Sequence, residues 1–195
     1  MANGVIGMDR TEIRVALEQT PLPIPYSGTE TGHHYVSLLK YPDAIEQIPE
    51  LQGEPVMKHV IKSMHAPNAE FETVRMAHWF ANVENGESAL RCLSLGFVFR
   101  DRRGFVNFAE CMMLTGNLLH YANNDIIASD APFLLEIQPA IFREENLTGW
   151  IMDLYVTGSG VGQDTARQRL DQNLERMIPF LQTGGVAPSS TQTPS

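Results

Sequence analysis

The chain has 195 residues, of which 43% are hydrophobic and 19% are charged, and its formal net charge is −9. This composition is typical of a globular domain, and the length is enough for one substantial core. A net negative charge argues against a surface that neutralises a phosphate backbone, although it suits a wall past which DNA slides without sticking. We therefore expect no specific nucleic-acid binding.

The two cysteines, Cys92 and Cys111, follow no metal-binding or redox spacing, and the sequence leaves open whether they pair. No stretch approaches the ~20 apolar residues of a membrane span, and the N-terminus lacks the basic and apolar regions of a secretory signal. These features predict a soluble protein of a reducing cytoplasm, with no membrane partner.

The first third of the chain predicts few regular elements. Residues 9–17 carry an aspartate and a glutamate at the spacing of a helix-capping box, so a short helix is expected there. A connector rich in proline and glycine follows, and residues 34–41 have the pattern of a strand. Residues 42–49 are expected to form a turn or a single helical turn.

Clearer patterns follow in the middle of the chain. Pro55 suits the first position of a helix, and apolar residues recur at helical spacing up to Pro67. Next the apolar period changes to two on either side of a polar turn, which predicts a hairpin with strands at residues 71–82 and 89–101. Residues 104–125 return to helical spacing and predict a second helix.

The last third predicts another hairpin and a long helix. Residues 133–142 and 150–158 alternate between apolar and polar positions around a polar turn, and Pro139 suggests an edge position or a bulge. After the glycine-rich stretch at residues 157–162, Asp164 is expected to cap a final helix.

Together these elements predict a single α+β domain at residues 1–182. Its sheet is expected to be mixed and mainly antiparallel, with about four to five strands flanked by helices. Residues 183–195 are of low complexity and predict an extended C-terminal tail.

The glycine-rich stretch at residues 157–162 has a catalytic alternative, because backbone N–H groups before a helix can bind a phosphate. The stretch lacks the Lys-Ser/Thr ending of a P-loop and the glycine spacing of a dinucleotide site. We therefore favour a flexible connector between strand and helix, and keep a small phosphate- or nucleotide-binding enzyme as the alternative function.

The histidines show no catalytic or metal-binding pattern. His33 and His34 are adjacent, so on a strand they would point to opposite faces. His78 lies in an alternating strand and is expected to pack rather than act as a base, and no serine or cysteine has the context of a nucleophile. The sequence therefore predicts no catalytic residue, no metal site and no cofactor.

The densest basic cluster contains Arg100, Arg102 and Arg103, where a strand leads into a helix. A solvated turn is the ordinary interpretation of such a run. The alternative is a contact between subunits, in which these arginines meet an acidic patch at Glu144 and Glu145.

The order of elements over residues 90–158 is the part of the sequence that can be compared with a known family. A strand ends near Gly104 and Phe105 and leads into a helix, and a passage from Pro139 to Glu144 leads to a strand that opens with Trp150. This order resembles the tail-terminator (tail-completion) proteins of long-tailed bacteriophages. The likeness covers a little over a third of the chain and leaves out its N-terminal third and its C-terminal end.

Members of that family form a ring, commonly of six subunits, that ends the tail tube and meets the head connector. The resemblance implies a structural virion protein without enzymatic activity, made in the host cytoplasm and located at the tail-to-head junction. Its partners would be copies of itself, the tail tube or sheath protein and the connector, with DNA able to pass through the ring. We expect the C-terminal tail, with Pro188 and Thr191, to contact a neighbouring subunit.

Two further functions stay open. A neck, connector or tail-tube subunit is the nearest relative of the terminator role. A monomeric binding module of the host is a more distant possibility.

Overall fold

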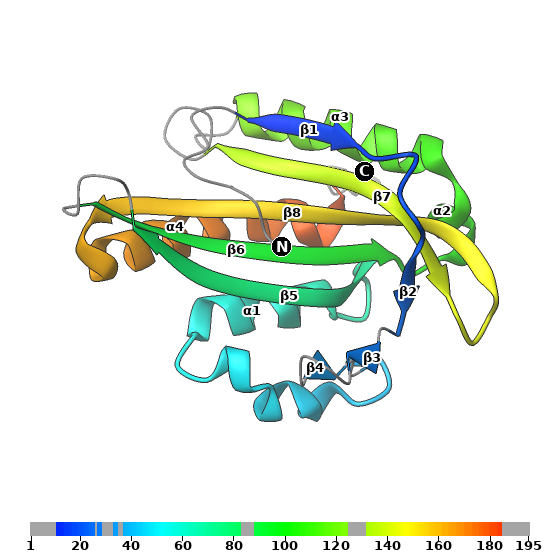
Figure 1. Cartoon of the computed structure of the whole chain (residues 1–195), viewed down its shortest axis with the longest axis horizontal. Helices are drawn as coiled ribbons and strands as arrows, with labels where there is room; N and C mark the ends of the chain where they lie inside the picture. Colours follow the sequence, from blue (N-terminus) through cyan, green and yellow to red (C-terminus); the bar gives the residue numbers. More distant parts are fainter. Residues whose placement is uncertain are drawn as a thin grey trace, which may run out of the picture.

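The computed structural model describes residues 11–25, 27–28, 33–34, 37–82, 88–124 and 132–184. In chain order the elements are β1 (Glu12–Val15), β2 (Leu22–Ile24), β3 (Ser27–Gly28), β4 (His33–His34), η1 (Pro42–Gln47), η2 (Pro49–Leu51), α1 (Pro55–Met64), β5 (Phe71–Asn82), β6 (Ser88–Phe99), α2 (Arg102–Val106), α3 (Phe108–Asn124), β7 (Phe133–Phe142), β8 (Leu147–Val161) and α4 (Gly162–Thr183). Figure 1 shows one large sheet, with α3 and α4 behind it and α1 beside β5.

The large sheet has six strands in the order β1-β7-β8-β6-β5, and β2 also pairs with β7. The long strands β5, β6, β8 and β7 are antiparallel neighbours, whereas β1 and β2 run parallel to β7. The predicted α+β class is therefore confirmed, with a mixed, mainly antiparallel sheet flanked by helices. The sheet has more strands than predicted because two short N-terminal strands join it.

The helix predicted over residues 9–17 is wrong, because residues 12–15 form the edge strand β1. Ile13 and Val15 are β-branched and alternate with charged residues, which suits a strand better than a helix. β1 pairs with residues 134–137 of β7, and Ile13 packs against the main core. This tertiary pairing outweighs the local capping signal, whose Asp9 lies outside the described residues.

The strand predicted over residues 34–41 is also largely wrong. A short pairing of β4 with β3 is present, but residues 38–40 form a turn that buries Leu38. The helical turn predicted over residues 42–49 is present as η1, and η2 follows it.

The main core lies between the sheet and the three long helices, on the side called here the helix face. The apolar positions of alternating strand residues and of helices α1, α3 and α4 meet there, as the sequence periods predicted. Its largest fully buried side chains include Phe71, Phe97, Phe133, Phe180 and Met64. Pro55 begins α1 as expected.

A smaller apolar cluster lies on the opposite side of the sheet, called here the second face. It is covered by α2 and β2 and contains Ile24, Val74, Val98, Phe105, Ala140, Phe142 and Ile151. The helix predicted over residues 104–125 is divided at Asn107, whose backbone is extended. This division lets Phe105 pack on the second face while α3 packs on the helix face.

The glycine-rich stretch at residues 157–162 is not a flexible connector, which corrects that prediction. β8 continues to Val161 and pairs with β6, and α4 begins directly at Gly162 without a side-chain cap from Asp164. A Cβ atom at Gly158 would collide with the Leu170 nitrogen and the Ala166 oxygen of α4. Gly158 and Gly160 are therefore needed for close packing of α4 on the strand.

Pro139 lies inside β7, opposite Trp150 of β8. On its other side the pairing with β1 ends at Ile137, and the pairing with β2 begins at Ala140. The missing N–H group of the proline therefore falls in a local gap of the sheet, which is an edge-like position.

Candidate interaction surfaces

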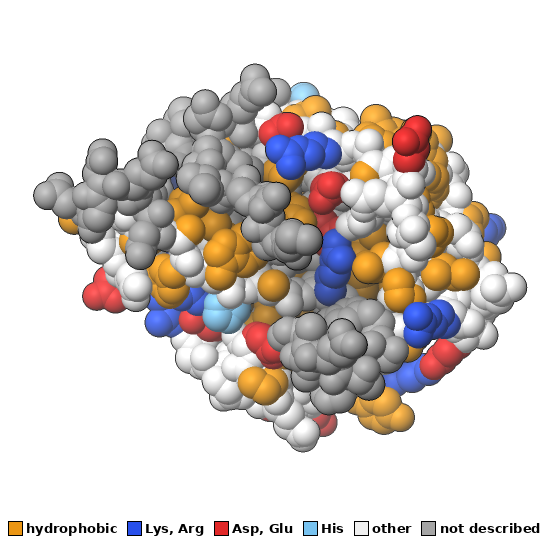
Figure 2. Space-filling model, in the orientation of Figure 1, with side chains coloured by type: hydrophobic (Ala, Val, Ile, Leu, Met, Phe, Trp, Pro, Cys, Tyr) orange, Lys and Arg blue, Asp and Glu red, His pale blue; other side chains and the backbone are white. Residues whose placement is uncertain are grey.

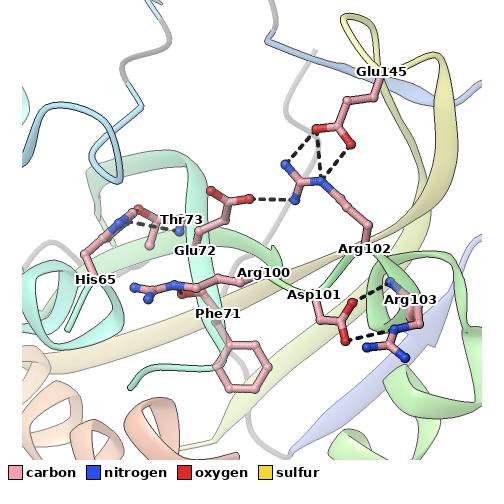
Figure 3. A network of polar contacts seen from close by, with 9 residues as sticks. All are labelled: His65, Phe71, Glu72, Thr73, Arg100, Asp101, Arg102, Arg103 and Glu145. Atoms are coloured by element: carbon pink, nitrogen blue, oxygen red, sulfur yellow. Dashed lines mark hydrogen bonds and ion pairs between the residues drawn. The ribbon is translucent and has the colours of Figure 1, made fainter. Parts of the chain in front are cut away.

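Residues 100–103, called here the arginine corner, join the end of β6 to α2 (Figure 3). Asp101 is the N-cap of α2, and its carboxylate accepts the Arg103 N–H at 2.9 Å. The sharp change from strand to helix separates the three arginine side chains, so each has a different environment.

Arg102 is held between two carboxylates of its own chain. Its Nε donates to both oxygens of Glu145 at 3.0 Å, and its Nη1 donates to the buried Glu72 at 2.9 Å. The guanidinium also lies 3.7 Å from the ring centre of Phe142. Burial by itself lowers the pKa of Arg102, but the hydrogen bonds to the two carboxylates outweigh it and raise the pKa.

Arg100 points into the protein and joins α1 to β5. Its Nε donates to the Phe71 carbonyl at 2.8 Å, and its Nη2 donates to the Met64 carbonyl at 2.9 Å. Burial lowers the pKa of Arg100, and its charge also disfavours protonation of nearby His65. The His65 pKa is lowered to about 4, mainly by burial, while its Nε2 accepts the Thr73 N–H at 3.3 Å.

Arg103 is the exposed member of the arginine corner, with 94% of its side chain accessible, and it contacts only the nearby Asp101 among the described residues. It lies on the rim of a shallow hollow of about 700 Å³. The hollow is lined by Ala69, Glu70, Phe99, Arg100, Asp101, Arg103, Gly104, Asn107 and Glu110. Acidic and basic groups both line it, so its charge selects neither anions nor cations.

These contacts refine the predicted subunit interface. Arg102 and Glu145 do meet, as the acidic-patch hypothesis requires, but they meet within one chain and need no second subunit. Glu144 is exposed in the same turn. Pro188 and Thr191 lie outside the described residues. An intersubunit role for this set of residues stays a prediction.

A polar cluster that the sequence did not reveal lies on the second face. Asp153 is fully buried, and its carboxylate accepts hydrogen bonds from Arg75 and from Gln138, the latter at 2.7 Å. Arg75 reaches Asp153 by crossing β6 at Gly96, where a Cβ atom would lie 2.7 Å from the carboxylate. Figure 2 shows acidic and basic side chains in the middle of this face, between apolar areas.

A second buried cluster joins the start of α1 to β6 and α4. The Arg91 guanidinium donates to Glu54 at 2.6 Å and to Nδ1 of His78 at 3.2 Å. His78 Nε2 in turn contacts the Glu50 carbonyl at 2.9 Å, so both ring nitrogens have a partner. Arg167 of α4 pairs with the other Glu54 oxygen at 3.3 Å. This arrangement fits the packed role predicted for His78.

The cysteines and the glycine-rich stretch have largely packed surroundings in the part of the chain that the structure describes. No group of three or more His, Cys, Asp or Glu side chains in those ranges lies close enough to hold a metal ion. Cys92 and Cys111 are buried free thiols, and burial raises their pKa values to about 11 and about 12. In the glycine-rich stretch Gly158 and Gly160 pack against α4, whereas a Cβ atom at Gly162 would meet nothing within 4 Å. No helix in the described ranges is both long and apolar enough to cross a membrane.

Exposed apolar side chains gather at two lateral ends of the sheet. At the end called here the β5 end, Phe80 is 37% exposed beside exposed Ala77 and half-buried Trp79. At the other, called here the α3 end, exposed Val15 ends β1, exposed Leu17 follows it, and Met112 and Met113 lie on α3. Figure 1 shows β1 and α3 together at one side of the sheet and β5 at the other.

The two sheet edges differ as well. β5 has 12 residues and, among the strands that the structure describes, pairs only with β6, so its outer edge is long. The opposite edge is built from the four-residue β1 and the three-residue β2, which contains Pro23. A long free edge is a template for pairing with another strand.

Comparison of the chain with models of protein families, with curated proteins and with solved structures gives no match.

Proposed function

We propose that the protein is a structural subunit of a phage virion, which forms a closed ring that ends the tail tube and joins it to the head connector. The observation that carries the proposal is the pair of unlike apolar surfaces at opposite ends of one sheet. The order of elements from residue 90 to 158, which resembles the tail-terminator family, supports the phage setting.

Unlike surfaces at opposite ends favour contact between different faces of neighbouring copies. Such a heterologous contact repeats from copy to copy and closes into a ring when the rotation per subunit allows it. The β5 end carries aromatic side chains and free backbone groups, whereas the α3 end carries flexible methionines that adapt to an irregular partner. The chemistry of each end therefore suits the other better than itself.

The proposed role resides in surfaces and requires no catalytic group. The net charge of −9 suits a ring through which DNA passes, because an acidic wall does not hold a phosphate backbone. The clusters around Arg91, Arg102 and Asp153 tie helices and strands together within one subunit. A stiff subunit keeps its two ends at a fixed angle, as ring closure demands.

The first test is the mass of the purified protein in solution, by light scattering and native mass spectrometry. We expect one closed species of several subunits, commonly six, alone or after addition of the tail-tube protein. A strict monomer under both conditions would contradict the proposal.

Charge substitutions at the two ends sharpen the test. Phe80→Asp and Met113→Asp are each expected to prevent ring formation, because each buries a carboxylate in one of the apolar ends. A mixture of the two variants retains one intact pair of ends and should form dimers only. Val161→Asp is the matched control, since Val161 is 77% exposed and belongs to neither end. Rings that survive both end substitutions would exclude this interface.

A further inference from the structure

We propose that neighbouring copies join by strand pairing, with the free edge of β5 in one copy bound to β1 of the next, so that the sheet continues between subunits. This inference rests on the proposed ring and specifies its contact. The occupant of the β5 edge is thus a second copy of this chain.

The free part of β5 has a defined start. A β-bulge interrupts its pairing with β6 between Thr73 and Arg75. At Thr73 the backbone N–H donates to His65 Nε2, and at Phe71 the carbonyl accepts a hydrogen bond from Arg100 Nε at 2.8 Å. His65 and Arg100 therefore occupy the start of this edge, and from Arg75 to Asn82 no backbone group bonds outward to the residues that the structure describes.

Strand direction favours β1 as the partner. β1 is parallel to β7, and β7, β8, β6 and β5 alternate in direction, so β1 and β5 run oppositely within one subunit. A ring whose axis lies roughly along the strands preserves these directions from copy to copy. β1 of the next copy would consequently lie antiparallel to β5, which is the slightly more stable kind of ladder.

The register between β5 and β1 can change only in steps of two residues, because each side chain must stay on its own face of the sheet. Ile13 of β1 packs on the helix face, as Met76 of β5 does, and a slip of one residue would turn Ile13 to the wrong side. In one register that leaves each side chain on its own face, Ile13 of one copy lies opposite Phe80 of the next, and Arg14 lies opposite Trp79. The first is an apolar pair and the second allows a cation–π contact.

In the same register Glu12 of one copy lies opposite Ala81 of the next. Directly opposed residues of an antiparallel pair have Cβ atoms roughly 4.5–5.5 Å apart, which is near the separation that a disulfide needs. The native thiols Cys92 and Cys111 are buried and do not compete. The contact can therefore be trapped by a pair of introduced cysteines.

The experiment uses the full chain with Glu12→Cys, with Ala81→Cys, and with both, under mild oxidation. We expect the double variant to give a ladder of linked chains up to the ring number. A mixture of the single variants should give a linked dimer, and each single variant alone should stay unlinked. Arg169→Cys, on the exposed side of α4, replaces Ala81→Cys in the matched control and should abolish the ladder.

Two outcomes would overturn the inference. In the first, mass measurement shows intact rings but no cross-links form. If a second cysteine pair, with Ala77→Cys in place of Ala81→Cys to test another register, also gives no cross-links, the ring is retained and the β5–β1 contact is excluded. A linked dimer from Ala77→Cys or Ala81→Cys alone would show instead that two β5 edges pair about a twofold axis. If the parent chain forms no assembly, the proposed function itself fails, which the mass measurement reports separately.

Discussion

The two faces of the sheet are buried in different ways. The helix face is covered by α1, α3 and α4 and carries a large apolar cluster, with the buried ion pair of Arg91 and Glu54 beside it. The second face has a smaller apolar cluster and, beside it, the fully buried carboxylate of Asp153 with its partners Arg75 and Gln138. Both faces therefore combine an apolar cluster with a buried ion pair, but the apolar cluster is much larger on the helix face.

This difference has a consequence for tolerance to substitution. An apolar core accepts many side chains of similar volume, whereas a buried charge that loses its partner is strongly destabilising. On each face, one glycine lies where a larger side chain cannot be accommodated. Gly158 allows contact with α4 on the helix face, and Gly96 allows Arg75 to cross β6 on the second face.

The largest effect is expected for Gly158→Ala. The new Cβ atom would meet backbone atoms of α4 rather than a movable side chain, so the whole helix must shift. We expect a loss of about 4 kcal/mol in the free energy of unfolding, measured by urea denaturation, at the upper end of overpacking effects. A loss below about 1 kcal/mol would show that α4 is less firmly seated than its contacts indicate.

A loss of about 3 kcal/mol is expected for Asp153→Asn, because it leaves the Arg75 guanidinium without its carboxylate. A double-mutant cycle with Arg75→Met measures the coupling of the pair by chemical denaturation. Since the methionine removes the charge, Asp153→Asn should be much less damaging in that background. Additive losses would mean that the two side chains stabilise the second face independently.

Acid should weaken the protein through His65. The ring stays neutral in the fold down to about pH 4, whereas it protonates near pH 6.5 when unfolded. The unfolded state therefore binds the additional proton in this window, and the free energy of unfolding should fall by about 2 kcal/mol from pH 6.5 to pH 4.

His65→Gln retains an acceptor for the Thr73 N–H and removes the titration, so thermal denaturation across this range should show a flatter dependence on pH. Burial raises the carboxyl pKa of Asp171, so this residue makes the free energy of unfolding change with pH in the opposite direction. It does so equally in the parent protein and in the His65→Gln variant. An unchanged slope in the variant would assign the acid effect to other groups.

The smallest effect is a gain. Gly116 lies in α3, and a Cβ atom there meets nothing within 4 Å. Gly116→Ala should therefore raise the free energy of unfolding by roughly 0.5–1 kcal/mol through helix propensity alone. It is also the matched control for Gly158→Ala, because the chemical change is the same and only the surroundings differ.

The sequence predicts the helix face better than the second face, for a physical reason. The period of two around Leu95 and Leu154 and the helical period in α1 and α4 report directly which side chains meet the core. Asp153 and Arg75 are separated by many residues, and only the register of β5, β6 and β8 brings them together. A single sequence carries no signal for that register.

The errors near the N-terminus and before α4 have a related cause. β1 has too few residues to show a reliable period, and its strand conformation depends on β7, far along the chain. The glycine-rich stretch is typical of a loop by composition, but pairing with β6 and contact with α4 make it the end of a strand. The arginine corner was recognisable as a basic cluster, whereas the inward direction of Arg100 depends on α1 and β5.

The crossing of Arg75 over Gly96 also bears on how chains of this kind can diverge. A side chain at position 96 would occupy the space that the guanidinium uses on its way to Asp153. A descendant that acquires a side chain at position 96 must lose the ion pair between Arg75 and Asp153. The buried carboxylate at position 153 must then become protonated or be replaced by a neutral residue. Positions 75, 96 and 153 are accordingly expected to change as a set, across three different strands of the sheet.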